Sequence, residues 1–152
     1  MEKRKIIRFQ IFSVIFTWIL GTILHFLYEW SGDNKIIASF SAVNESTWEH
    51  LKLVFFPMLI TTIVGFLVIG KDNKKFWCAK TIGIILAMSF IIVFFYTYTG
   101  IIGTNFAILD IGSFFVAVIL GLLIVYANNF LINRRKKEFG TYMMLGMSKG
   151  QI

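Results

Sequence analysis

Four long apolar runs constrain the fold of this chain more than any other feature. They cover residues 11–28, 53–69, 82–98 and 111–132. At a helical rise of about 1.5 Å per residue, each run forms a helix close to the thickness of a bilayer's hydrocarbon core, about 30 Å. The apolar residues are continuous rather than alternating, which is typical of membrane-spanning helices and not of barrel strands. The runs therefore predict four transmembrane helices.

Composition agrees with the bilayer as the solvent of this chain. Hydrophobic residues make up 57% of the sequence and its mean hydropathy is +0.77, whereas soluble domains contain roughly 45–50% apolar residues. The polar segments between the runs are too short to hold a soluble domain. We therefore expect an all-α polytopic membrane protein, with a four-helix transmembrane domain in residues 1–132 and a basic cytoplasmic tail in residues 133–152.

The basic residues predict how the helices are oriented. Thirteen of the fifteen Lys and Arg residues lie before the first run, after the fourth, or in residues 71–80. Four spans place these three segments on one side, and the positive-inside rule assigns that side to the cytoplasm together with both termini. The net charge of +7 then reflects topology and attraction to lipid headgroups, so we expect the lipid bilayer, and no nucleic acid, as a partner. The single cysteine, Cys78, lies in the middle basic segment and excludes an internal disulfide.

Most other polar chemistry is concentrated on the opposite side. At the end of the first run, His25 and Glu29 are four residues apart and share a helix face. The stretch NESTWEH directly precedes the second run and could face them. Imidazole and carboxylate groups suit zinc, iron or manganese, although no HExxH or CxxC spacing occurs. The candidate polar or metal cluster consists of His25, Glu29, Asn44, Glu45, Glu49 and His50.

The same stretch also has interpretations that need no metal. In one register Asn44 is the N-cap of the second helix, and in a competing register Ser46 is the N-cap with Glu49 as its capping-box partner. A pocket for a polar solute or a lipid headgroup is a further alternative. Asp110, at the head of the fourth run, is expected to cap that helix or to favour its dipole.

Two motifs resemble a known family. LHFLYEWSG and FSAVNESTWEHLKLVFFPML are similar to sequences in an uncharacterised family of small bacterial multi-span membrane proteins, known as a domain of unknown function. The resemblance extends from about residue 8 to about residue 120. It implies a multi-pass protein of a bacterial plasma membrane and implies no activity.

The C-terminal sequence VYANNFLINRRKKEFGTYMMLGMSKGQI resembles a second family. Four consecutive cations follow the last run, and an aliphatic, Met-containing segment comes next, which predicts a stop-transfer flank or a helix that lies against a partner. The segment is similar to the bacitracin- and peptide-resistance branch of the FtsX-like ABC transporter permeases, where it meets the ATPase subunit. The matching positions are Arg134, Arg135, Lys136, Lys137, Glu138, Phe139, Gly140, Leu145, Gly146, Met147 and Lys149.

These observations give two functional hypotheses. The first is a non-enzymatic integral membrane protein, permease-like or accessory to a transporter, that needs no cofactor and contacts an ABC ATPase through its C-terminal segment. The chain has no Walker A motif and so is not itself that ATPase. The alternative is a membrane-embedded metal-binding protein or metal-dependent hydrolase that holds a divalent metal with the outer His/Glu cluster.

Overall fold

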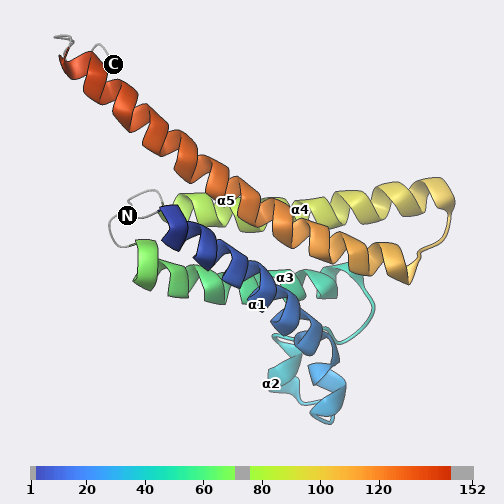
Figure 1. The fold of residues 1–152 in the computed structure, drawn as a ribbon. Coiled ribbons are helices and arrows are strands. Elements are labelled where there is room, and N and C mark those ends of the chain that lie inside the picture. The colour runs from blue at the N-terminus through green and yellow to red at the C-terminus, as the bar shows by residue number, and fades with distance from the viewer. Residues whose placement is uncertain (1–2, 71–75, 145–152) are drawn as a thin grey trace.

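A computed structural model describes residues 3–70 and 76–144, with residues 3, 69 and 125–143 described by their backbone alone. Within these ranges every regular element is a helix (Figure 1). They are α1 (Lys3–Trp30), α2 (Lys35–Ala38), α3 (Thr47–Gly65), the π-helical turn η1 (Phe66–Gly70), α4 (Phe76–Ile102) and α5 (Ala107–Met144). The predicted all-α fold is confirmed.

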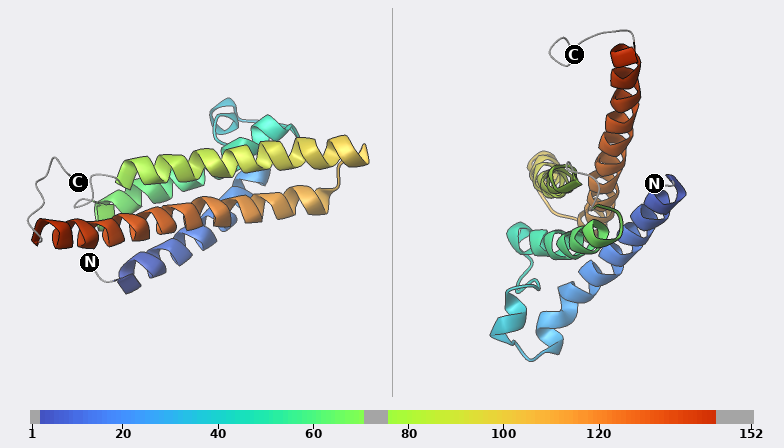
Figure 2. Two further views of the ribbon diagram at one scale, coloured as in Figure 1. Left: turned by 90° about the horizontal axis from the view of Figure 1, so that it is seen from above. Right: turned by 90° about the vertical axis from the view of Figure 1, so that its left-hand side faces the viewer.

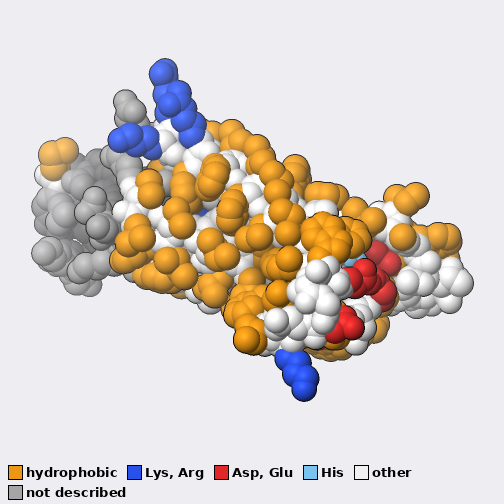
Figure 3. Space-filling model, turned by 90° about the horizontal axis from the view of Figure 1, so that it is seen from below, with side chains coloured by type: hydrophobic (Ala, Val, Ile, Leu, Met, Phe, Trp, Pro, Cys, Tyr) orange, Lys and Arg blue, Asp and Glu red, His pale blue; other side chains and the backbone are white. Residues whose placement is uncertain are grey.

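Four of these helices are long and apolar enough to cross a membrane, as predicted. The candidate spans are Arg4–Trp30, Thr47–Val68, Phe76–Ile102 and Ala107–Ile124. Large hydrophobic side chains such as Ile15, Ile85 and Ile111 are about half exposed, which is expected of surfaces that face lipid. On the face in Figure 3, hydrophobic side chains cover the middle of the molecule, most Lys and Arg gather at one end, and Asp and Glu gather toward the other.

The long helices pack in antiparallel pairs. α4 lies along α5, α1 lies against α3, and α3 also contacts α4. Figure 2 shows α4 and α5 side by side over much of their length. The buried core lies between α3, α4 and α5, around the fully buried side chains of Val54, Ala87 and Val118. The start of α1 and the end of α5 lie toward the same end of the molecule.

At one end of the bundle, Lys80 near the start of α4 lies beside Phe9 near the start of α1. The Nζ atom of Lys80 lies 5.7 Å from the ring centroid of Phe9 and 5.9 Å from that of Phe76. Lys80 is 2% exposed and belongs to α4. Its assignment to a loop between the second and third runs, in residues 71–80, was therefore wrong. α4 begins at Phe76, before the apolar run, and the rings of Phe9 and Phe76 lie beside the ammonium group of Lys80. The other cations assigned to this loop, at positions 71, 74 and 75, lie outside the described residues.

Replacing Lys80 with methionine should raise the stability of the protein. Among the described residues, Nζ of Lys80 has no hydrogen-bond partner, and replacing a buried charge with an apolar side chain of similar size is often stabilising, here by about 1–2 kcal/mol. The measurement is thermal unfolding in detergent. Lys52→Met is the matched control and should lower stability, because Nζ of Lys52 donates to the Ala38 carbonyl at 2.8 Å. A destabilised Lys80→Met protein would contradict this account.

Cys78 provides a test of the predicted orientation. It lies exposed in the first turn of α4, at the end of the bundle assigned to the cytoplasm. A membrane-impermeant maleimide should therefore leave Cys78 unlabelled in intact cells and label it after permeabilisation. Because the chain has one cysteine, any labelling comes from Cys78. Labelling in intact cells would show that the predicted orientation is the wrong way round.

α5 extends well past its membrane-spanning part. It is helical from Ala107 to Met144, and its C-terminal part projects beyond the other helices in Figure 1. The predicted boundary between residues 132 and 133 thus falls inside a continuous helix, and the division into two domains stays a prediction. The proposed coupling residues 134–140 lie on this helix, whereas Leu145, Gly146, Met147 and Lys149 lie outside the described residues.

Candidate metal centre

His50 is positioned by the first turn of α3. The N-cap of this helix is Ser46, so the competing register was right and the assignment of Asn44 as N-cap was wrong. Asn44 instead accepts a hydrogen bond from the Ser46 amide through Oδ1, at 3.0 Å. Ser46 makes no capping bond with its side chain, and Glu49 accepts from the amide of Val43. The predicted capping box is therefore not formed.

The same turn determines which nitrogen of His50 is free. Nδ1 of His50 lies 2.8 Å from the carbonyl oxygen of Ser46. A carbonyl oxygen can only accept, so Nδ1 carries the proton and donates it. In the neutral ring, the lone pair is then on Nε2, as in histidines that bind a metal through Nε2.

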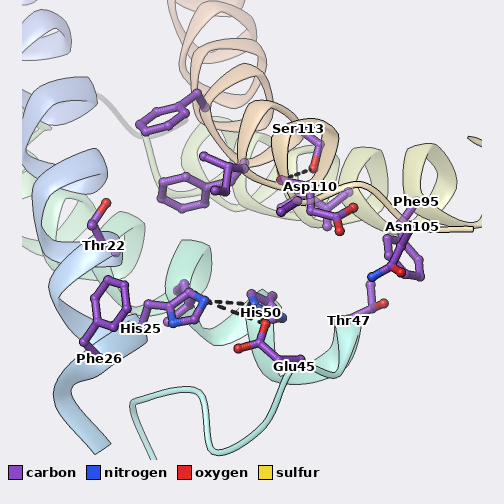
Figure 4. Close-up of a pocket in the computed structure, with 17 residues that line it drawn as sticks. Thr22, His25, Phe26, Glu45, Thr47, His50, Phe95, Asn105, Asp110 and Ser113 are labelled. Atoms are coloured by element: carbon purple, nitrogen blue, oxygen red, sulfur yellow. Dashed lines mark hydrogen bonds and ion pairs between the residues drawn. The ribbon is translucent and has the colours of Figure 1, made fainter. Parts of the chain in front are cut away.

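His25, Glu45 and His50 converge on one point (Figure 4). Nε2 of His50 lies 3.3 Å from Nε2 of His25 and 3.4 Å from Oε2 of Glu45. Oε2 of Glu45 is 3.9 Å from Nε2 of His25. In a tetrahedral zinc site with bonds of about 2.0–2.2 Å, neighbouring ligand atoms lie roughly 3.3–3.6 Å apart. Two of the three separations fall in this range, and the third exceeds it by a few tenths of an ångström.

The segment that carries Glu45 is attached to α1 by Ser41. This serine is fully buried. Its hydroxyl donates to the carbonyl of Leu24 and accepts from the amide of Tyr28 at 3.2 Å. Leu24 directly precedes His25 and Tyr28 follows it by three residues, so these bonds hold the segment beside the first histidine.

A second attachment joins the same segment to α3. Oε2 of Glu49 is 2.6 Å from Nζ of Lys52 and 3.1 Å from the amide nitrogen of Val43. Lys52 in turn donates to the carbonyl of Ala38 at 2.8 Å. Glu49 is thus engaged with Lys52 and with the backbone before Glu45. Its position suggests that it orients the segment rather than binding an ion.

The six predicted cluster residues therefore separate into two groups. His25, Glu45 and His50 each offer a ligand atom within 4.8 Å of the others. Glu29 is exposed at the end of α1 and is not among these residues. Glu49 lies outside this group and accepts from the amide of Val43, and Oδ1 of Asn44 is occupied by the amide of Ser46.

A pocket of about 430 Å³ opens beside the three ligand residues, between α1, α3, α4 and α5. Its volume falls in the range typical of small-molecule sites, roughly 300–1,000 Å³. Much of its wall is apolar and is formed by Phe26, Leu53, Ile91, Phe95, Phe114 and Phe115. His25, Glu45 and His50 all line it.

Five polar residues on the remaining wall of this pocket were not predicted as site residues. They are Thr22, Thr47, Asn105, Asp110 and Ser113. Asp110 lies in the first turn of α5, as predicted for a residue that favours the helix dipole, and accepts a hydrogen bond from the hydroxyl of Tyr98. Its acidic character at the head of an apolar run was a signal, but no local pattern shows that α5 brings it opposite the histidines.

Comparison with known proteins identifies a family and one partial relative. The model of a family described as "Family of unknown function (DUF6512)" matches residues 1–145. A segment of 46 residues is 41% identical to the bacitracin export permease protein BceB of Halalkalibacterium halodurans. This segment covers 30% of the present chain and 7% of that permease, so the match spans only a small part of either protein. No solved structure gives a significant match.

Proposed function

Because this chain belongs to the family of unknown function DUF6512, we propose its function from the site itself: it is an integral membrane protein that binds a divalent metal ion, zinc foremost, through His25, Glu45 and His50. The site lies at the end of the bundle that the charge distribution assigns to the outside. The observation that carries the proposal is the convergence of two imidazole nitrogens and one carboxylate oxygen at 3.3–3.9 Å.

The ligand types favour zinc over other common divalent ions. Two imidazoles and one carboxylate form a donor set found in zinc enzymes, with a fourth position left for water or a ligand. Calcium and magnesium prefer all-oxygen sites. Iron(II) also binds two imidazoles and one carboxylate, but an octahedral shell would place neighbouring ligand atoms about 3.0–3.1 Å apart. The separations of 3.3–3.9 Å found here are closer to those of a tetrahedral zinc site.

The surroundings support binding because they fix the ligands before an ion arrives. The Ser46 carbonyl selects the tautomer of His50, which is the role of hydrogen-bonded partners around many metal sites. Ser41 and the Glu49–Lys52 pair hold the segment that carries Glu45. Glu45 remains largely exposed, with 83% of its side-chain surface accessible, so an ion can enter from outside the bundle.

The test is the metal content of the purified protein. Wild-type protein in detergent, loaded with zinc and desalted, should retain about one zinc per chain, and Glu45→Gln should retain much less. Glu29→Gln is the matched control, since it removes one carboxylate near the same end without touching the site. Zinc that is absent from the wild type, or retained equally by Glu45→Gln, would overturn the proposal.

A second candidate function is contact with an ABC ATPase in a bacterial plasma membrane. Two observations favour it: the 41% identity to part of BceB, a protein named as a bacitracin export permease, and the continuation of α5 to Met144 beyond its membrane-spanning part. Arg134–Lys137 would lie on this projecting helix, close to the headgroups.

Deletion of residues 138–152 tests this candidate. Co-purification with an ATPase encoded nearby should be lost, while membrane insertion and zinc content stay unchanged. Co-purification that survives the deletion would leave the C-terminal segment as a stop-transfer flank.

A further inference from the structure

The pocket beside the metal ligands is built to hold more than an ion. Three protein ligands leave one position of a tetrahedral zinc site free. Because His25, Glu45 and His50 all line the pocket, a ligand bound there would lie beside the metal that these residues would hold. A ligand in the pocket can therefore place an anionic oxygen on the metal.

The pocket wall formed by α5 carries a negative charge, opposite in sign to the charge of a metal-loaded site. Two neutral imidazoles and one carboxylate leave a bound divalent ion with a net positive charge, whereas Asp110 supplies a carboxylate from α5. In Figure 4 the Asp110 side chain extends into the space that His50 and Glu45 approach from below. Tyr98 donates to Oδ1 of Asp110, and among the described residues no side chain donates to Oδ2. That oxygen is available to a cationic or hydrogen-bond-donating group.

The rest of the wall accommodates an apolar body. Phe26, Leu53, Ile91 and Phe95 line the pocket, and the helices that carry them are membrane spans. The pocket volume of about 430 Å³ is suited to a headgroup and the first carbons of a chain, with the remainder of the chain in the surrounding lipid.

We propose that this pocket binds a zwitterionic lipid headgroup, with its phosphate on the metal held by His25, Glu45 and His50 and its ammonium group at Asp110. The proposal rests on the metal site proposed above. A purely anionic headgroup would meet the metal but would bring a second negative charge into the pocket and leave Oδ2 of Asp110 without a cationic partner. A zwitterionic headgroup pairs its phosphate with the metal and its ammonium group with Asp110.

The experiment uses the full chain in a non-ionic detergent, loaded with cobalt(II) in place of zinc. The visible absorption of cobalt(II) reports directly on its ligands. Lysophosphatidylethanolamine should change this spectrum in a saturable way. Asp110→Asn should weaken that response at least about tenfold, because a charge-assisted bond is lost, while the response to lysophosphatidylglycerol, which has the phosphate without the ammonium group, should not weaken.

Two further variants separate binding from folding. Tyr98→Phe removes the hydrogen bond from α4 to Asp110 but keeps the Asp110 carboxylate, so it should retain the preference for the zwitterionic lipid. Asp33→Asn removes an acid in the turn after α1, outside the pocket, and should behave as the wild type. Equal loss of response in Tyr98→Phe and Asp110→Asn would assign the effect to packing and overturn the role of Asp110.

The outcomes distinguish the two proposals. Failure of the wild type to bind cobalt would overturn the metal site and, with it, the lipid site. Cobalt binding without a spectral change on addition of lysophosphatidylethanolamine would overturn the lipid site alone. An equal response to free phosphoethanolamine would show that the ligand is a soluble zwitterion and would overturn its assignment as a lipid.

Discussion

Replacing His50 with alanine is expected to lower the affinity for zinc by more than about 100-fold, since loss of an outer-shell partner alone typically costs about 10–100-fold. His50 is central to the proposed site because its Nε2 is within 3.4 Å of both other ligand atoms. Its removal leaves one imidazole and one largely exposed carboxylate, a pair that holds zinc weakly.

Competition with a chromophoric chelator measures this change in affinity. Glu49→Gln is an informative companion, because Glu49 positions the Glu45 segment through Val43 and Lys52. We expect it to lower affinity by about tenfold, the low end of the effect of outer-shell partners, because Glu49 contacts the backbone before Glu45 and not a ligand atom. Equal affinities for wild type and His50→Ala would contradict the assignment of His50 as a ligand.

Replacing Gly121 with alanine is expected to destabilise the protein by about 1–3 kcal/mol, the usual cost of inserting a group into a packed interface. A Cβ atom at this position would lie 2.6 Å from the carbonyl oxygen of Gly83 and 3.1 Å from Cβ of Ala87. The first neighbour is backbone, so α4 and α5 would have to separate. Small residues at helix contacts in membranes permit such close approach.

Gly112→Ala on the same helix is the matched control. A Cβ atom there would meet nothing within 4 Å, so only the higher helix propensity of alanine acts, which is worth about 0.5–1 kcal/mol. The two identical substitutions should therefore change the unfolding temperature in opposite directions. A Gly121→Ala protein as stable as the wild type would show that α4 and α5 do not pack as closely as described.

The architecture was predictable from sequence because bilayer thickness sets the length of an apolar run. Helix boundaries were less predictable, since they depend on contacts rather than on hydropathy. Lys80 illustrates the difference: its charge suggested a loop, but the rings of Phe9 and Phe76 cover it inside α4. The extent of α5 to Met144, by contrast, agrees with the helix that was predicted after the last apolar run.

The candidate site was predictable in part. Two histidines near the same membrane face could be expected to approach each other, and they do so at 3.3 Å. The choice between Glu45 and Glu49 could not be made from sequence, because it depends on where the chain before α3 lies. Asp110 was recognised only as a helix-start residue, because its place in the pocket follows from how α5 packs against the other spans.

X-ray absorption at the zinc edge of the loaded protein tests the metal site most directly. We predict a first shell of nitrogen and oxygen at about 2.0–2.1 Å with the outer scattering of two imidazole rings, and the loss of one ring's contribution in either histidine variant. A shell without imidazole scattering, or one that contains sulfur from Cys78, would contradict the assignment of His25, Glu45 and His50 as the ligands.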